Sequence, residues 1–149
     1  MFRKASIEDL EALTRLALLL WPNHTFEDLQ EDIESLLSNP NAAFFLYFDQ
    51  ALPAGFAQCQ LRYDYVEGTE SSPVGYLEGV FVLKSHRKQG IAAQLLAQCE
   101  RWATLKGCVE FASDCELGNA ESQAFHLKCG FQEANRVICF RKKLRPEPD

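Results

Sequence analysis

The chain has 149 residues, of which 47% are hydrophobic and 24% are charged, and this composition is typical of one soluble globular domain with a substantial core. The formal net charge is −6, which argues against general nucleic-acid binding because that function needs a basic surface. The apolar stretches are too short to span a membrane, and charged residues interrupt the N-terminal segment, unlike a signal peptide. We therefore expect a soluble, cytoplasmic protein.

The spacing of hydrophobic residues predicts the element order βααβββαβαβ. Ser6 precedes leucines that recur every three or four residues up to Leu20, which is the pattern of an amphipathic helix, and Pro22 ends it. In chain order, we expect a strand at 2–4, helices at 7–20 and 26–37, strands at 43–48, 54–65 and 74–83, a helix at 92–106, a strand at 110–113, a helix at 120–129, a short strand at 131–133 and a strand at 137–142.

These elements predict an α/β (mixed α+β) fold class with one mixed sheet and helices on both of its faces. The helix between the strands at 74–83 and 110–113 makes a crossover, so those two strands should be parallel. Residues 1–144 form the expected domain. Residues 145–149 read RPEPD, and we expect a disordered tail there because they offer little apolar surface to bury.

Six cysteines are many for a chain of this length. They are Cys59, Cys99, Cys108, Cys115, Cys129 and Cys139. They form no CxxC motif and no zinc-type spacing with histidine, so we expect no metal site. Several fall at apolar positions, which predicts buried free thiols.

The octapeptide SHRKQGIA, Ser85–Ala92, joins the expected strand at 74–83 to the following helix. A helix start leaves backbone N–H groups unpaired and attracts anions, and Gly90 allows close approach to the backbone. A phosphate site is therefore plausible on these residues, and an ordinary solvated turn is the alternative. The stretch matches neither GxxxxGK[ST] nor GxGxxG.

In this setting the sequence resembles the GNAT superfamily of N-acetyltransferases. The match to its R/Q-x-x-G-x-G/A signature comprises Arg87, Lys88, Gln89, Gly90, Ile91 and Ala92. The resemblance implies a mostly antiparallel sheet with one splayed parallel strand pair. It also implies that this loop holds the pyrophosphate of the cosubstrate acetyl-coenzyme A, and that the backbone of Val80, Phe81 and Val82 pairs with the pantetheine arm. Asn119 and Gly130-Phe131 match as well.

Further blocks are similar to the bacterial aminoglycoside 6′-N-acetyltransferases. They are Trp21-Pro22-x-His24, Asp64-Tyr65, Ser71-Ser72-Pro73, Leu77–Leu83, Ala112-Ser113-Asp114, Arg136-Val137-Ile138 and Phe140-Arg141-Lys142. The resemblance implies acetylation of a small cationic aminoglycoside, antibiotic resistance and a homodimer. It places Trp21, His24, Tyr65, Glu78 and Asp114 around the acceptor.

Glu78 is the candidate catalytic residue. Amine acetylation releases a proton, and a carboxylate near the thioester can accept it directly or through water. Glu78 interrupts the apolar run YLEGVFV, where a carboxylate costs free energy unless it is paired or hydrated. On an alternating strand it can instead simply face solvent. A backbone N–H near Phe81 or Val82 would stabilise the oxyanion.

The other acceptor residues have structural alternatives too. Asp114 follows a strand expected to be parallel, where open α/β sheets bind ligands, but aspartate is also common in turns. Two carboxylates suit a multiply charged acceptor. Trp21 and Tyr65 offer flat faces to a sugar or cation, although a tryptophan at a helix end is often core. His24 suits a polar wall or a turn better than a base.

Two positions depart from the resemblance. His126 stands where many members of the superfamily have a tyrosine acid, and Asn135 stands where an acidic acceptor-binding residue is expected. The general acid is therefore unassigned. Two alternative functions stay open at this point: acetylation of another small amine or a peptide N-terminus, and non-catalytic binding of an acyl-coenzyme A.

Overall fold

The computed structural model describes residues 1–145 and 148, and it divides into two compact units, Met1–Asp114 and Cys115–Asp149. The first unit holds a five-stranded sheet in the order β1-β2-β3-β4-β5, in which only β4 and β5 run parallel. The strands are β1 (Phe2–Lys4), β2 (Ala42–Asp49), β3 (Leu52–Arg62), β4 (Val74–Val82) and β5 (Phe111–Ala112). This topology confirms the predicted mixed sheet and its parallel pair.

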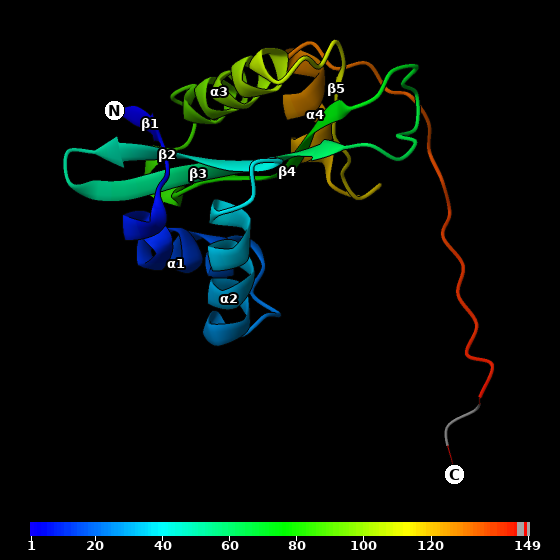
Figure 1. Cartoon of the computed structure of the whole chain (residues 1–149), viewed down its shortest axis with the longest axis horizontal. Coiled ribbons are helices and arrows are strands. Elements are labelled where there is room, and N and C mark those ends of the chain that lie inside the picture. The colour runs from blue at the N-terminus through cyan, green and yellow to red at the C-terminus, as the bar shows by residue number, and fades with distance from the viewer. Residues whose placement is uncertain (146–147, 149) are drawn as a thin grey trace. The chain divides into compact units, whose positions relative to one another are not determined.

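Helices cover both faces of this sheet, as predicted (Figure 1). A 3-10 turn, η1 (Ile7–Asp9), leads into α1 (Leu10–Leu20), and α2 (Phe26–Leu37) follows on the same face. Helix α3 (Ile91–Leu105) covers the other face, and a further 3-10 turn, η2 (Lys84–His86), precedes it. The α1 and α2 side is filled by Phe44, Leu46 and Phe56, which pack with the buried leucines of the two helices.

Local signals explain where the first two helices begin. The backbone N–H of Ser6 donates to Oδ2 of Asp9 at 2.9 Å, so the first turn is closed by a side chain. Thr25 caps α2, because its Oγ1 accepts from the N–H of Asp28 at 3.2 Å. Both starts agree with the sequence prediction.

Strand β4 contains a bulge at Glu78 that the sequence pattern did not reveal. Leu77 pairs with Cys59 and Gly79 pairs with Gln58, so Glu78 is an extra residue opposite β3. A Cβ added at Gly75 would meet Ala103 of α3, whereas one added at Gly79 would meet Trp21 at the end of α1. Residues four apart in a regular strand face the same side, so the bulge has reversed the alternation.

The second unit contains α4 (Ala120–Lys128). The predicted strands at 131–133 and 137–142 are wrong for this structure, since residues 131–143 form no helix or strand. The apolar run Val137–Phe140 supplies strand propensity, but a strand also needs a hydrogen-bonded neighbour, which propensity does not specify. The predicted tail falls partly on residues 146, 147 and 149, which lie outside the described residues, and the boundary at 144 stays a prediction.

The cysteines follow the expected pattern in part. All six are free thiols; Cys59, Cys99 and Cys108 are buried, while Cys115 and Cys139 are exposed. A hydrogen bond with Cys59, together with burial, raises the pKa of the Cys99 thiol well above its usual range, so this core thiol stays protonated. Across residues 1–145 and 148, no helix has the length and apolarity to span a membrane, and no cluster of three or more His, Cys, Asp or Glu is arranged to hold a metal.

Candidate active site

Four polar side chains form one connected group where β4 and β5 separate. The carboxylate of Glu78 is paired with Arg62 of β3, at 2.7 Å between Oε1 and Nη2. The Arg62 guanidinium lies over the ring of Tyr76, with Cζ 3.4 Å from the ring centroid. The Tyr76 hydroxyl in turn donates to Oδ2 of Asp114. The two predicted carboxylates are therefore linked through Arg62 and Tyr76.

The contacts within this group shift the pKa values of Arg62 and Tyr76. Burial lowers the pKa of Arg62, but the hydrogen bond and charge of Glu78 outweigh that effect and raise it overall. Burial, reinforced by the hydrogen bond to Asp114, raises the pKa of Tyr76 well above its usual range. Tyr76 therefore stays a neutral hydrogen-bond donor at any physiological pH.

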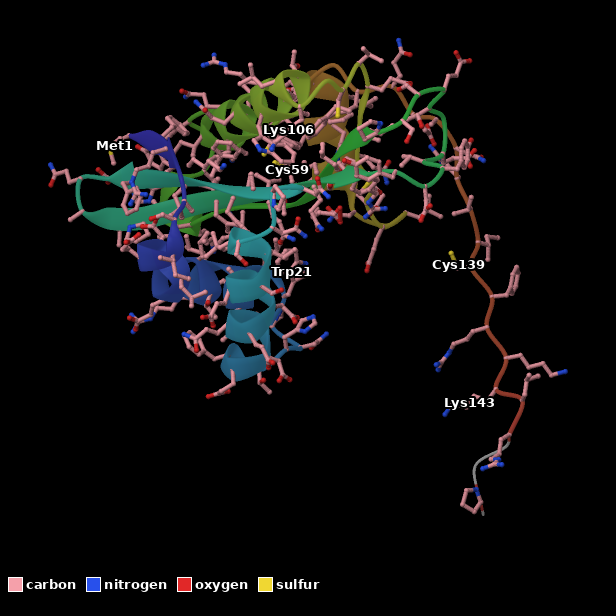
Figure 2. All side chains as sticks on the ribbon, in the orientation of Figure 1. Met1, Trp21, Cys59, Lys106, Cys139 and Lys143 are labelled. Atoms are coloured by element: carbon pink, nitrogen blue, oxygen red, sulfur yellow. The ribbon has the colours of Figure 1, made fainter. Side chains whose placement is uncertain are left out.

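Trp21, at the end of α1, lies directly on β4 at Gly79. A Cβ at Gly79 would come within 2.6 Å of Cζ2 of Trp21, so only glycine admits the indole ring this close to the strand. The ring also meets Phe56 edge-on, with centroids 6.0 Å apart. Trp21 is half-buried on the α1 side of the sheet (Figure 2). It therefore acts as core on one side and can act as a wall beside Glu78, the residue before Gly79.

Tyr65 and His24 lie outside the hydrogen-bonded group. Tyr65 is 76% exposed, and its hydroxyl accepts from the N–H of Gly68 at 3.4 Å. His24 is exposed, and its backbone N–H donates to the carbonyl of Trp21 at 3.3 Å, which is a turn contact. The structure shows no contact of either side chain with Glu78 or Asp114.

The edge of β4 that faces β5 is open for most of its length. Within Met1–Asp114, β5 pairs with β4 only at Gly75 and Tyr76, and β4 continues to Val82. Val80, Phe81 and Val82 are paired with β3 on their other side. The backbone of this stretch is thus available to an extended ligand along one edge.

The predicted phosphate loop adopts an unusual backbone before α3. Lys88 and Gly90 both have left-handed φ angles, 63° and 76°, and α3 begins at the next residue, Ile91. Two left-handed residues before a helix turn backbone N–H groups toward one side, which suits an anion. A Cβ at Gly90 would meet nothing within 4 Å, so the loop is open there.

The remaining loop residues have mixed placements. Arg87 folds back, and its Nε donates to the carbonyl of Val82 at 2.9 Å, near the ring of Phe81. Gln89 is exposed, Ile91 is buried and Ala92 is half-buried. Arg87 is thus tied to the end of β4 through its Nε, although the residue is exposed overall.

The turn before this loop is tied to a neighbouring hairpin. His86 of η2 places Nε2 2.8 Å from Oδ2 of Asp49 at the end of β2, and its Nδ1 lies 2.8 Å from Oγ of Ser85. Both ring nitrogens have partners, so the histidine orientation is fixed. This contact anchors the start of the loop to β2.

Asn119 belongs to the second unit, where its local role is clear. Its Oδ1 accepts from the N–H of Ser122 at 3.1 Å, so it caps α4.

A model of the acetyltransferase (GNAT) family matches residues 8–131. The chain belongs to the GNAT family. Its open β4 edge and its loop at the start of α3 are thus those of a GNAT protein, and the resemblance seen in the sequence is confirmed.

Relatives within the GNAT family are similar over nearly the whole chain. The aminoglycoside N(6′)-acetyltransferase type 1 of Serratia marcescens is 42% identical over 139 residues, covering 92% of this chain and 94% of the relative. A structure of AAC(6′)-Iy in complex with the bisubstrate analog CoA-S-monomethyl-acetylneamine superposes with a TM-score of 0.92 at 42% identity, covering 96% of this chain and 97% of that chain. AAC(6′)-IG from Acinetobacter haemolyticus gives a TM-score of 0.90 at 36% identity, covering 97% and 99%.

Sequence reasoning missed Arg62 and Tyr76 in this GNAT site. Tyr76 lies two residues before Glu78, a spacing that places side chains on one face of a strand, and this signal was available. Arg62 gave no such signal, because its position opposite Val74 depends on the register of β3 and β4. Only the paired strands bring it to Glu78.

Proposed function

We propose that this protein transfers the acetyl group of acetyl-coenzyme A to the 6′-amine of aminoglycosides and thereby confers resistance to these antibiotics. The observation that carries the proposal is a pair of carboxylates, Glu78 and Asp114, at the point where β4 and β5 diverge. Arg62 and Tyr76 connect these two carboxylates. Similarity to aminoglycoside 6′-N-acetyltransferases extends over nearly the whole chain, and it supports the same substrate class.

The cosubstrate site in this proposal combines the β4 edge and the loop before α3. The backbone of Val80–Val82 has one edge without a strand neighbour, which suits the amide groups of a pantetheine arm. The left-handed backbone of Lys88 and Gly90 suits a pyrophosphate. Arg87, Gln89, Ile91, Ala92 and Asn119 complete the proposed set. When bound, the coenzyme supplies the activated acetyl thioester.

The proposed acceptor site lies beside Glu78. Asp114 pairs with an ammonium group of the aminoglycoside, since its carboxylate has capacity beyond the one hydrogen bond from Tyr76. Trp21 forms a wall against a sugar ring, supported by its position on Gly79. Tyr65 and His24 are proposed as outer contacts, and the exposure of Tyr65 leaves its ring available.

Glu78 is the proposed proton acceptor. The acceptor amine must be neutral to attack, so one proton leaves its ammonium form before attack. A second leaves the nitrogen once the N–C bond forms and the C–S bond breaks. Glu78 receives protons from the nitrogen, directly or through water, and returns them to solvent. The coenzyme thiolate takes one proton from solvent, so the balance is one proton released per acetyl group transferred.

We also propose a cytoplasmic homodimer. Residues 137–142 begin with the apolar run Val137–Phe140, and Val137, Ile138 and Phe140 are exposed in the structure. An unpaired segment with strand propensity can pair with a second copy of the chain. The cytoplasm is proposed because it contains acetyl-coenzyme A.

The test measures acetyl transfer to a panel of aminoglycosides with and without a 6′-amine, alongside polyamines and peptides. We expect turnover only where the 6′-amine is present. Equal turnover of compounds lacking it would overturn the regiochemistry, and turnover of polyamines or peptides alone would favour another amine acetyltransferase. Glu78→Gln should lose most of kcat and keep its affinity for acetyl-coenzyme A, whereas a purely binding module would be unaffected.

A further inference from the structure

Arg62, the last residue of β3, places a positive charge between the two carboxyl groups of the site. Its Nη2 lies 2.7 Å from Oε1 and 3.0 Å from Oε2 of Glu78, and its Nε lies 3.2 Å from Oε2. Its guanidinium also lies over the Tyr76 ring, with Cζ 3.4 Å from the ring centroid. Contacts on its edge and on its face fix the guanidinium plane, and with it the orientation of the Glu78 carboxylate.

The two carboxylates consequently have different environments. Glu78 has a side chain that is 18% exposed and a cation as its partner. Asp114 receives a hydroxyl from Tyr76, and none of the ion pairs within Met1–Asp114 includes it. Glu78 is thus paired directly with Arg62, whereas Asp114 interacts with the same cation only through its charge at longer range. Unequal environments of this kind assign different roles to paired acids.

We propose that Arg62 is a positioning residue that divides the roles of the two carboxylates. It fixes the orientation of the Glu78 carboxylate as the proton acceptor, and it leaves Asp114 to bind an ammonium group of the acceptor. This inference rests on the proposed function, because it requires Glu78 to receive the amine proton. Arg62 acts through Glu78 and does not touch the reacting atoms.

Charge explains why a cation helps at this position. The acceptor amine arrives as an ammonium ion, and the neighbouring positive charge of Arg62 favours its neutral, nucleophilic form. Each carboxylate oxygen can accept more than one hydrogen bond, so the contacts with Arg62 leave room on Glu78 for the amine or a water. The proton passes from the nitrogen to Glu78 and then to solvent, while the N–C bond forms and the C–S bond breaks.

Three charged or titratable groups belong to the same connected group as Glu78. Arg62 faces it from β3, Tyr76 from β4, and Asp114 extends the group beyond β5. The nearby end of α1 contributes Leu20 and Trp21, which do not titrate. Without Arg62, Glu78 would be a largely buried carboxylate near another carboxylate, and its protonated form would become more favourable.

The test compares Arg62→Met and Arg62→Lys in the full chain, with kcat and KM measured from about pH 5 to 9. We expect Arg62→Met to lower kcat about 10- to 100-fold and to move the acidic limb of the kcat/KM profile to higher pH. In Arg62→Lys the acidic limb of the kcat/KM profile should lie close to its wild-type pH, because lysine supplies the positive charge but not the bidentate geometry. The KM for acetyl-coenzyme A should stay unchanged in both variants.

Arg15→Met is the matched control, because it removes an exposed arginine that pairs with Glu11 on the surface of α1. Arg62→Gln provides the same measurement if Arg62→Met does not fold. If Arg62→Met or Arg62→Gln folds and its acidic limb lies at the wild-type pH, this inference is overturned. Loss of activity in Glu78→Gln would in that case still support the proposed function. Full activity of Glu78→Gln would instead reject the catalytic role of Glu78 itself.

Discussion

Replacing Gly79 with alanine tests the contact between α1 and β4 on which the proposed acceptor wall at Trp21 depends. The new Cβ would lie 2.6 Å from Cζ2 and 2.8 Å from Cη2 of Trp21, and 3.1 Å from Cδ2 of Leu20. Separations below about 3 Å are not tolerated by carbon atoms, so the indole ring must move. The ring has little freedom to do so, because its other side meets Phe56.

The expected cost follows from overpacking. Inserting a methyl group into a packed site costs about 1 to 3 kcal/mol, which for a domain of this size lowers Tm by about 3 to 9 °C. Displacement of Trp21 should also raise the KM for the aminoglycoside several-fold. The KM for acetyl-coenzyme A should change less, because the added Cβ points toward Trp21 and Leu20 and not toward the β4 edge that faces β5.

Thermal denaturation and steady-state kinetics of Gly79→Ala provide the measurement. Gly118→Ala is the control, since a Cβ there would meet nothing within 4 Å, and the residue has no left-handed φ angle. A Tm within about 1 °C of the wild type, together with an unchanged aminoglycoside KM, would refute the reasoning. Such a result would mean that Trp21 moves freely and forms no wall.

Three further predictions concern other contacts. Tyr76→Phe removes the hydrogen bond to Asp114 and should raise the aminoglycoside KM about 3- to 10-fold without shifting the pH profile, as measured by steady-state kinetics. Hydrogen bonds from Arg3 hold the pKa of Asp9 below its ordinary value, so this pair stabilises the fold above about pH 4, and the stabilisation is lost as the pH falls through the lower, folded pKa. Urea unfolding of Asp9→Asn should therefore show a loss of about 1 to 3 kcal/mol at pH 7 that shrinks toward pH 3; an equal loss at both would contradict this. His86→Ala should raise the KM for acetyl-coenzyme A and leave the aminoglycoside KM unchanged, and the opposite pattern would refute its role in anchoring the loop.

Local patterns were sufficient for most elements of the fold. The leucine spacing before Trp21 predicted α1, and the expected helix at 26–37 matches α2, because helix formation depends on neighbours three and four residues apart. The strand predicted at 137–142 failed for the opposite reason. Its run of β-branched and aromatic residues is a local property, whereas the neighbour that a strand requires lies elsewhere in the chain or in another molecule.

The candidate site also combines features that local sequence determines with features that only strand pairing determines. The sequence by itself determined the GNAT membership, the loop before α3 and the two carboxylates, because each depends on residue types at short, readable spacings. Only the tertiary structure decided how those carboxylates are held. The bulge at Glu78 and the register of β3 against β4 bring Arg62 onto Glu78, and the parallel pairing of β5 brings Asp114 to Tyr76. These contacts join residues 16 and 38 positions apart, and strand pairing, which no local pattern encodes, is what sets their distance.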